Sequence, residues 1–220
     1  MSPESTGFLY PFLEAEEHDA TSLLADLAAS ARAKAAESAA LQHSTLQECA
    51  GQIADAADMI AERFGAGGRM YTFGNGGSST DAATLADLFS RPPHGRPLPA
   101  WSLAADQAVV TALGNDVGFD LVFSRQIIAH SGGHDMAVAL STSGNSADLT
   151  LALAEAKRRG LLTIGFAGYD GGRFATDDRV DFCFVVRSQS VHRIQESQAL
   201  LGYRIWAAVQ HRLAGGEGPG

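Results

Sequence analysis

Short apolar runs alternate with helix-like stretches over most of the chain after Gly68. Strands that are buried on both faces and separated by helices are typical of a parallel sheet. The pattern therefore predicts a doubly wound α/β domain, in which ligands bind beyond the carboxyl ends of the strands. The runs are RMYTFG, PAWSLA, MAVALS, LLTIGFAG and DFCFVV, and the helical patterns lie at 78–89, 119–130 and 146–159.

The region before this domain is rich in Ala, Leu, Glu and Gln, with apolar residues such as Leu23, Leu27 and Ile60 at helical spacing. It predicts two helices or one long bent helix, which either cover the core or pack on another subunit. The small and polar residues at both ends predict flexible tails at 1–13 and 214–220 around a single domain at 14–213.

Glycines follow the first predicted strand, in the stretch TFGNGGSSTDAATLADLF. Gly74, Gly76 and Gly77 allow a tight turn and a close approach of the backbone to a ligand, at the start of a helix near Ser78. A dinucleotide fingerprint is excluded, because Ser79 stands where the third glycine belongs and no acid ends the following strand at the expected distance.

Hydroxyl side chains follow the third predicted strand, in the stretch ALSTSGNSADL. Ser141, Thr142, Ser143 and Ser146 supply four hydroxyls, and Gly144 relieves the turn before a helix that begins near Ser146. The stretch contains no lysine, unlike a P-loop, so it predicts a phosphate monoester held by neutral donors. An ordinary serine cap is the alternative, but a cap explains only one of the four hydroxyls.

Charge and cysteine content exclude several classes of protein. The 220 residues contain 16 Lys+Arg and 25 Asp+Glu, so a non-specific grip on nucleic acid is not expected. Cys49 and Cys183 lie far apart in a sequence without a signal peptide, which argues against a disulfide framework and predicts a cytoplasmic protein. No apolar run approaches the roughly 20 residues that a membrane span requires.

Five stretches resemble, in order and spacing, the sugar isomerase (SIS) domain of phosphoheptose isomerases. They are GNGGSS at 74–79, GNDVGFDLVFSRQI at 114–127, STSGNSAD at 141–148, GYDGG at 168–172 and RIQESQ at 193–198. The resemblance implies a three-layer α/β/α sandwich around a five-stranded parallel sheet of the flavodoxin-like kind, with an N-terminal helical extension. It also implies a homotetramer with sites shared between subunits.

The same resemblance implies a substrate site with a phosphate cradle, an aspartate at the sugar end and a glutamine that contacts substrate or metal. The cradle consists of Ser141, Thr142, Ser143 and Ser146 with Asn75 and Ser78, the aspartate is Asp116 and the glutamine is Gln195.

The acid–base and zinc positions of the family depart from its pattern. The family places a histidine and a glutamate on the helix after the first glycine loop and a histidine on the last helix, where this chain has Thr84, Leu88 and Tyr203. Leucine cannot transfer a proton, and these side chains are poor zinc ligands, so no zinc or other cofactor is expected. Asp87 and His192 lie near these positions and are candidate substitutes.

The sequence therefore predicts a protein that binds sugar phosphates but lacks most of the catalytic residues, acting as a sensor or regulatory protein with an unknown protein partner. An aldose–ketose isomerase with a different acid and base is the alternative. A structural oligomer with a vestigial site is a third interpretation, which the retained hydroxyl loop disfavours.

Overall fold

The computed structural model describes residues 20–215 of the chain. The tail predicted at 1–13 and nearly all of the tail predicted at 214–220 lie outside the described residues. The chain divides into two compact units, residues 1–39 and 40–220. None of the helices in the described part is both long and apolar enough to cross a membrane.

Two helices precede the sheet, which was one of the two predicted arrangements. α1 (Ala20–Glu48) begins in the first unit and ends in the second, and α2 (Ala50–Gly65) follows after a break at Cys49. The interpretation of 14–213 as one domain stays a prediction.

Five parallel strands form the sheet, in the order β2-β1-β3-β4-β5. Every residue of β1, β3 and β4 is buried, because helices cover both faces of these strands. The predicted doubly wound parallel sheet is therefore confirmed. The strands are β1 (Met70–Gly74), β2 (Ala100–Ser102), β3 (Met136–Leu140), β4 (Leu162–Gly168) and β5 (Phe182–Val186).

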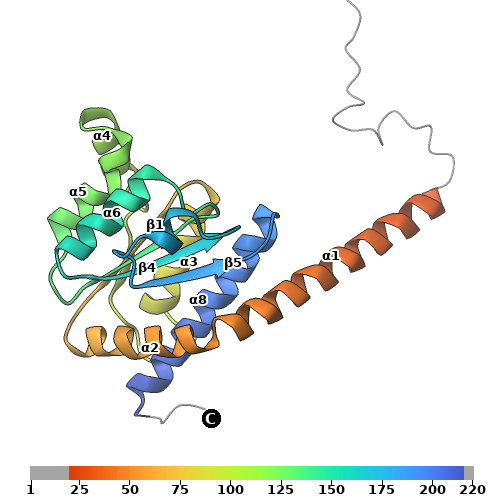
Figure 1. Ribbon diagram of the computed structural model, residues 1–220, viewed down its shortest axis with the longest axis horizontal. Helices are drawn as coiled ribbons and strands as arrows, with labels where there is room; N and C mark the ends of the chain where they lie inside the picture. The colour runs from red at the N-terminus through yellow and green to blue at the C-terminus, as the bar shows by residue number, and fades with distance from the viewer. Residues whose placement is uncertain (1–19, 216–220) are drawn as a thin grey trace, which may run out of the picture. The chain divides into compact units, whose positions relative to one another are not determined.

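Alternate residues of the strands point into two separate cores. Met70 packs with α2, α3 and α8 in one core, and Tyr71 and Phe73 pack with α5 and α6 in the other. In Figure 1, α5 and α6 lie on one side of the strands and α2 and α8 on the other. The helices after α2 are α3 (Gly77–Ser90), α4 (Gln107–Asp116), the 3-10 turn η3 (Phe119–Leu121), α5 (Val122–His130), α6 (Ala147–Arg158), α7 (Gly172–Thr176) and α8 (Val191–Leu213).

Helix α4 was missed by the apolar pattern. None of its residues is buried, and only Val110 and Leu113 of this short helix pack against a core, so it has no fully buried face. Its start depends instead on Asp106, whose side chain accepts hydrogen bonds from the backbone N–H groups of Ala108 and Val109. The helix predicted at 119–130 is η3 followed by α5.

Candidate functional site

The glycine loop and the hydroxyl loop begin side by side at the carboxyl edge of the sheet. Gly74, the last residue of β1, is paired with Leu140, the last residue of β3. A side-chain contact also joins the two loops, because Asn75 Nδ2 donates to both carboxylate oxygens of Asp148, at 3.1 and 2.9 Å. Asp148 lies in the first turn of α6. The parallel sheet thus brings together two loops that are far apart in the sequence.

Ser141 gives the hydroxyl loop its shape. Its side chain is buried, and its Oγ accepts hydrogen bonds from the backbone N–H groups of Ser143, at 3.3 Å, and Gly144, at 3.0 Å. Thr142, Ser143 and Ser146 are partly exposed. Three of the four predicted hydroxyls are therefore accessible to a ligand, and the fourth supports the turn that presents them.

Ser146 is the N-cap residue of α6, yet its side chain makes no capping hydrogen bond. A serine at this position normally accepts from an N–H group in the first turn. The backbone N–H groups of Asp148 and Leu149 donate to the Asp148 carboxylate instead, so that acid and not Ser146 satisfies the first turn of α6. An ordinary serine cap therefore does not explain Ser146, whose side chain is partly exposed in the same loop as Thr142 and Ser143.

Glycines allow the hydroxyl loop to pack tightly on the loop after β4. Gly144 has a φ of +65°, and a Cβ there would lie 2.2 Å from the carbonyl oxygen of Gly171. Gly172 has a φ of +54°, and a Cβ there would lie 2.3 Å from the carbonyl oxygen of Ser143. No side chain fits between these backbones, so both positions require glycine.

The first turns of α8 connect both loops to α3. Gln198 is 1% exposed, and its Nε2 donates to the carbonyl oxygen of Ser141 at 2.8 Å. One turn earlier, Gln195 Nε2 donates to Asp81 Oδ2 of α3 at 2.7 Å. Gln195 also lies against the glycine loop, since a Cβ on Gly77 would be 2.7 Å from its Nε2. Gln195 therefore lies where α8, α3 and the glycine loop meet.

Asp148 is a buried carboxyl group beside the hydroxyl loop, with an exposed fraction of 3%. Burial raises its pKa, and the hydrogen bond from Asn75 and those from the backbone of the first turn of α6 oppose this shift. The nearby Asp120 carboxylate of η3 raises the pKa further. The loop thus adjoins an acid whose environment disfavours its negative charge.

The predicted site residues do not all meet. Asn75, Gln195 and the four hydroxyl residues lie around the two loops, and Ser78 is buried in the first turn of α3. Asp116 is exposed at the end of α4, where it accepts a hydrogen bond from Asn115 Nδ2 at 3.2 Å. Within residues 20–215, no hydrogen bond joins Asp116 to either loop.

The side chains at the three departed positions on α3 and α8 are not zinc ligands. Thr84 Oγ1 donates to the carbonyl oxygen of Thr80, Leu88 packs against the core, and the Tyr203 ring packs on Trp206. In the described part of the chain, no three His, Cys, Asp or Glu side chains are grouped as metal ligands. One glutamine with a threonine and a tyrosine is not a zinc donor set.

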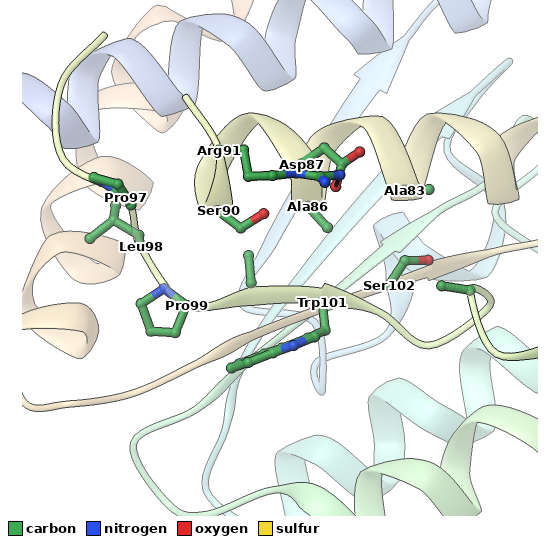
Figure 2. Close-up of a pocket in the computed structure, with 12 residues that line it drawn as sticks. Ala83, Ala86, Asp87, Ser90, Arg91, Pro97, Leu98, Pro99, Trp101 and Ser102 are labelled. Atoms are coloured by element: carbon green, nitrogen blue, oxygen red, sulfur yellow. Dashed lines mark hydrogen bonds and ion pairs between the residues drawn. The ribbon is translucent and has the colours of Figure 1, made fainter. Parts of the chain in front are cut away.

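The two candidate substitutes lie elsewhere. Asp87 forms an ion pair with Arg91 at 2.6 Å, with 59% of its side chain exposed. Figure 2 shows this pair above a cavity of about 650 Å³ that separates α3 from Trp101 and Pro99 of the edge-strand region. His192 is exposed in the first turn of α8. No described contact joins Asp87 or His192 to Gln195 or to the two loops.

Sequence reasoning missed Asp81 and Asp148. Each follows a loop serine by two or three residues, in the early part of a helix, where acids are common because of the helix dipole. Only the pairing of Asp81 with Gln195 and of Asp148 with Asn75 distinguishes them, and both pairs are distant in sequence. The spacing of three residues between Ser78 and Asp81 was the one signal in the sequence that could have indicated Asp81.

Residues 35–168 match the family model of the SIS domain. The chain belongs to the SIS domain family. It is similar to the phosphoheptose isomerase of Rhodospirillum rubrum, with 41% identity over 76% of this chain and 89% of the relative. It is also similar to that of Aquifex aeolicus, with 39% identity over 80% of this chain and 93% of the relative.

A solved structure supports the same relationship. The phosphoheptose isomerase of Neisseria gonorrhoeae has a TM-score of 0.77 with 32% identity, and the match covers 83% of this chain and 98% of that chain. The predicted three-layer α/β/α fold of the SIS type, with its five-stranded parallel sheet, is therefore confirmed.

The prediction of a sensor or regulatory protein is wrong, because relatives that match most of this chain at 41% and 39% identity are enzymes. The prediction treated the loss of the family's acid–base side chains at Thr84, Leu88 and Tyr203 as the loss of acid–base chemistry. The fold instead brings another carboxylate, that of Asp81, to the same pair of helices.

Proposed function

We propose that this protein is a sugar-phosphate isomerase that interconverts an aldose and a ketose, with sedoheptulose 7-phosphate as its substrate. The observation that carries the proposal is the hydroxyl loop before α6, where Thr142, Ser143 and Ser146 are partly exposed and the Ser146 side chain makes no capping hydrogen bond. The names of the relatives from Rhodospirillum rubrum and Aquifex aeolicus supply the reaction and the seven-carbon substrate.

In this proposal the phosphate binds to the hydroxyls of Thr142, Ser143 and Ser146 and to the N-terminus of α6. Neutral donors and a helix dipole hold a phosphate without a lysine. The sugar then extends past Asn75 toward Gln195, at the junction of α3 and α8. The hydroxyl and amide side chains orient the carbon chain, and the reaction itself moves one proton between neighbouring carbons.

The test is a time course of sedoheptulose 7-phosphate followed by NMR with the purified protein. The expected result is conversion to the aldose phosphate at about 1 s⁻¹ or faster, within the usual range of enzymes. A thermal-shift measurement with the same compound reports binding separately. Binding without conversion over hours, at substrate concentrations well above the dissociation constant, would contradict the proposal.

A homo-oligomer, most simply a tetramer, is part of the same proposal. In the first unit α1 leaves Leu24 65% exposed and Leu27 56% exposed, and apolar helix faces of this kind favour contacts between subunits. Light scattering at micromolar concentration is expected to give a multiple of the chain mass of 23.0 kDa. A mass near 23.0 kDa would exclude the oligomer.

A further inference from the structure

We propose that Asp81 is the base that carries the proton between the two reacting carbons of the sugar, an inference that rests on the proposed isomerase function. Such an isomerase needs a group that takes a proton from carbon and returns it to the neighbouring carbon. Thr84, Leu88 and Tyr203 offer no carboxylate or imidazole for this purpose. The candidate base must therefore come from another position near the two loops.

Asp81 lies on α3 between the glycine loop and the face that α3 presents to α8. It is one turn beyond Ser78, and its Oδ2 accepts from Gln195 Nε2 at 2.7 Å. Gln198, one turn further along α8, contacts the carbonyl oxygen of Ser141 in the hydroxyl loop. Two neighbouring glutamines on α8 thus connect the Asp81 carboxylate to the predicted phosphate position.

One oxygen of this carboxylate is held and the other is available. Asp81 is partly exposed, and within residues 20–215 its Oδ1 has no hydrogen-bond partner. A base needs one oxygen free to approach the carbon, while a second contact keeps the group in one orientation. Gln195 is therefore a positioning residue for Asp81.

Three other carboxylates considered for this role lack this combination. Asp148 is 3% exposed, and both of its oxygens accept from Asn75. Asp87 is paired with Arg91 beside the cavity in Figure 2. Asp116 accepts a hydrogen bond from its neighbour Asn115 at the exposed end of α4. Asp81 alone among them is both accessible and in contact with a predicted site residue on α8.

The proposed step conserves atoms and electrons. The Asp81 carboxylate removes a proton from C1 of the ketose, and the C1–H electron pair forms the C1=C2 bond while the C2 carbonyl oxygen takes a proton from water. The resulting enediol loses the proton of its C1 hydroxyl to water and forms the C1 aldehyde. C2 then takes the proton back from the Asp81 carboxylic acid, so no oxidant or reductant is required.

The test compares Asp81→Asn with Asp87→Asn, the same substitution six positions further along α3. For Asp81→Asn, kcat is expected to fall by about 10² to 10⁴-fold, the usual contribution of a positioned base, with KM changed by less than about threefold. Exchange of solvent deuterium into the sugar at C1 and C2 is expected to disappear. Asp87→Asn is expected to match the parent in turnover and in exchange.

The outcomes separate this inference from the proposed function. If Asp81→Asn turns over and exchanges deuterium like the parent, Asp81 is not the base and the isomerase proposal stands. If the parent itself neither converts nor exchanges the sugar, the proposed function fails, and the assignment of Asp81 fails with it. Asp81→Glu guards against a folding defect: it keeps a carboxylate, so it is expected to be faster than Asp81→Asn, and equal rates would overturn the assignment.

Discussion

The two ends of the candidate site differ in how firmly the fold holds them. At the phosphate end, Ser141, Asp148 and Gln198 are buried and hydrogen-bonded across three elements. On the face between α3 and α8, Thr84 and Tyr203 are exposed. A substitution at the first end disturbs the backbone of the loops, whereas one at the second changes only surface chemistry.

This difference explains how binding and catalysis can diverge separately within one family. The hydroxyl loop is formed by a strand end, a helix N-terminus and glycines, so its shape depends on the backbone of the sheet and its loops. A helix face can exchange its acid–base groups at little cost in stability, because side chains at its surface are replaceable. The contact between Asp81 and Gln195 places a carboxylate on this face, although Thr84 and Tyr203 offer none.

The largest expected effect is loss of folding stability when the phosphate end is disturbed at Gly144. Gly144→Ala places a methyl group 2.2 Å from the Gly171 carbonyl oxygen, at a positive φ, so a loss of about 3 kcal/mol or more is expected. Gly76 also has a positive φ, but a Cβ at this position would meet nothing within 4 Å, so Gly76→Ala is expected to cost about 1 kcal/mol. Denaturant unfolding measures both, and equal losses would show that the tight contact is not decisive.

Next in size is the loss of ligand binding when bulky side chains fill the hydroxyl loop. Sedoheptulose 7-phosphate at 100 times its dissociation constant is expected to stabilise the parent by about 2.7 kcal/mol. The double variant Ser143→Leu with Ser146→Leu is expected to show no such gain in a thermal-shift titration. The control carries Thr111→Leu and Thr176→Leu, two exposed positions outside the loop. Unchanged binding by the loop variant would place the phosphate elsewhere.

A smaller effect is expected from Asp148→Asn, and it depends on pH. Burial raises the pKa of Asp148 in the folded protein, so the folded state holds this proton more tightly than the unfolded state. The stability contributed by the group is present below the ordinary aspartate pKa of about 3.9 and falls as the pH rises to the folded value.

Asp148→Asn removes this decline, so its stability relative to the parent is expected to be greater at pH 7 than at pH 4. Unfolding measured across this range provides the check. Glu62→Gln, at an exposed position of α2, serves as the control for general charge effects. A relative stability that does not change with pH would contradict the raised pKa.

The sequence located the strands and the two loops well, but it did not reveal the contacts between α3 and α8. Apolar runs and glycine positions depend on local rules, so the strands and the loops that follow them were correctly located. The contacts of Asp81 with Gln195 and of Asn75 with Asp148 join residues 114 and 73 positions apart, and no local pattern carries such information. Helix α4 was missed because no buried face marks it.

The error about function had a different origin. Thr84, Leu88 and Tyr203 were compared one by one with the family's pattern, and three mismatches were interpreted as absence of catalysis. That comparison shows which side chains are missing at the family's positions. It does not show which other side chains the fold brings close together. Relatives that match over most of the chain carry more weight than three individual side chains.

The smallest expected effect is that of a metal chelator. Because Thr84, Leu88 and Tyr203 are not zinc donors, EDTA is expected to leave the rate of the parent unchanged, and the purified protein is expected to contain far less than one zinc per chain. Loss of activity in EDTA that zinc restores would show a metal site formed by other residues.

The matched variant is Thr84→His with Leu88→Glu and Tyr203→His. Positions 84 and 88 are one helical turn apart on α3, so their new side chains share a face of α3 with Asp81, whose partner Gln195 lies on α8. This variant is expected to bind about one zinc per chain by elemental analysis, since it joins three strong donors to the glutamine. If the variant remains metal-free, the backbones of α3 and α8 are not spaced as a zinc site requires. The helix face would then differ from a zinc site in backbone position as well as in its side chains.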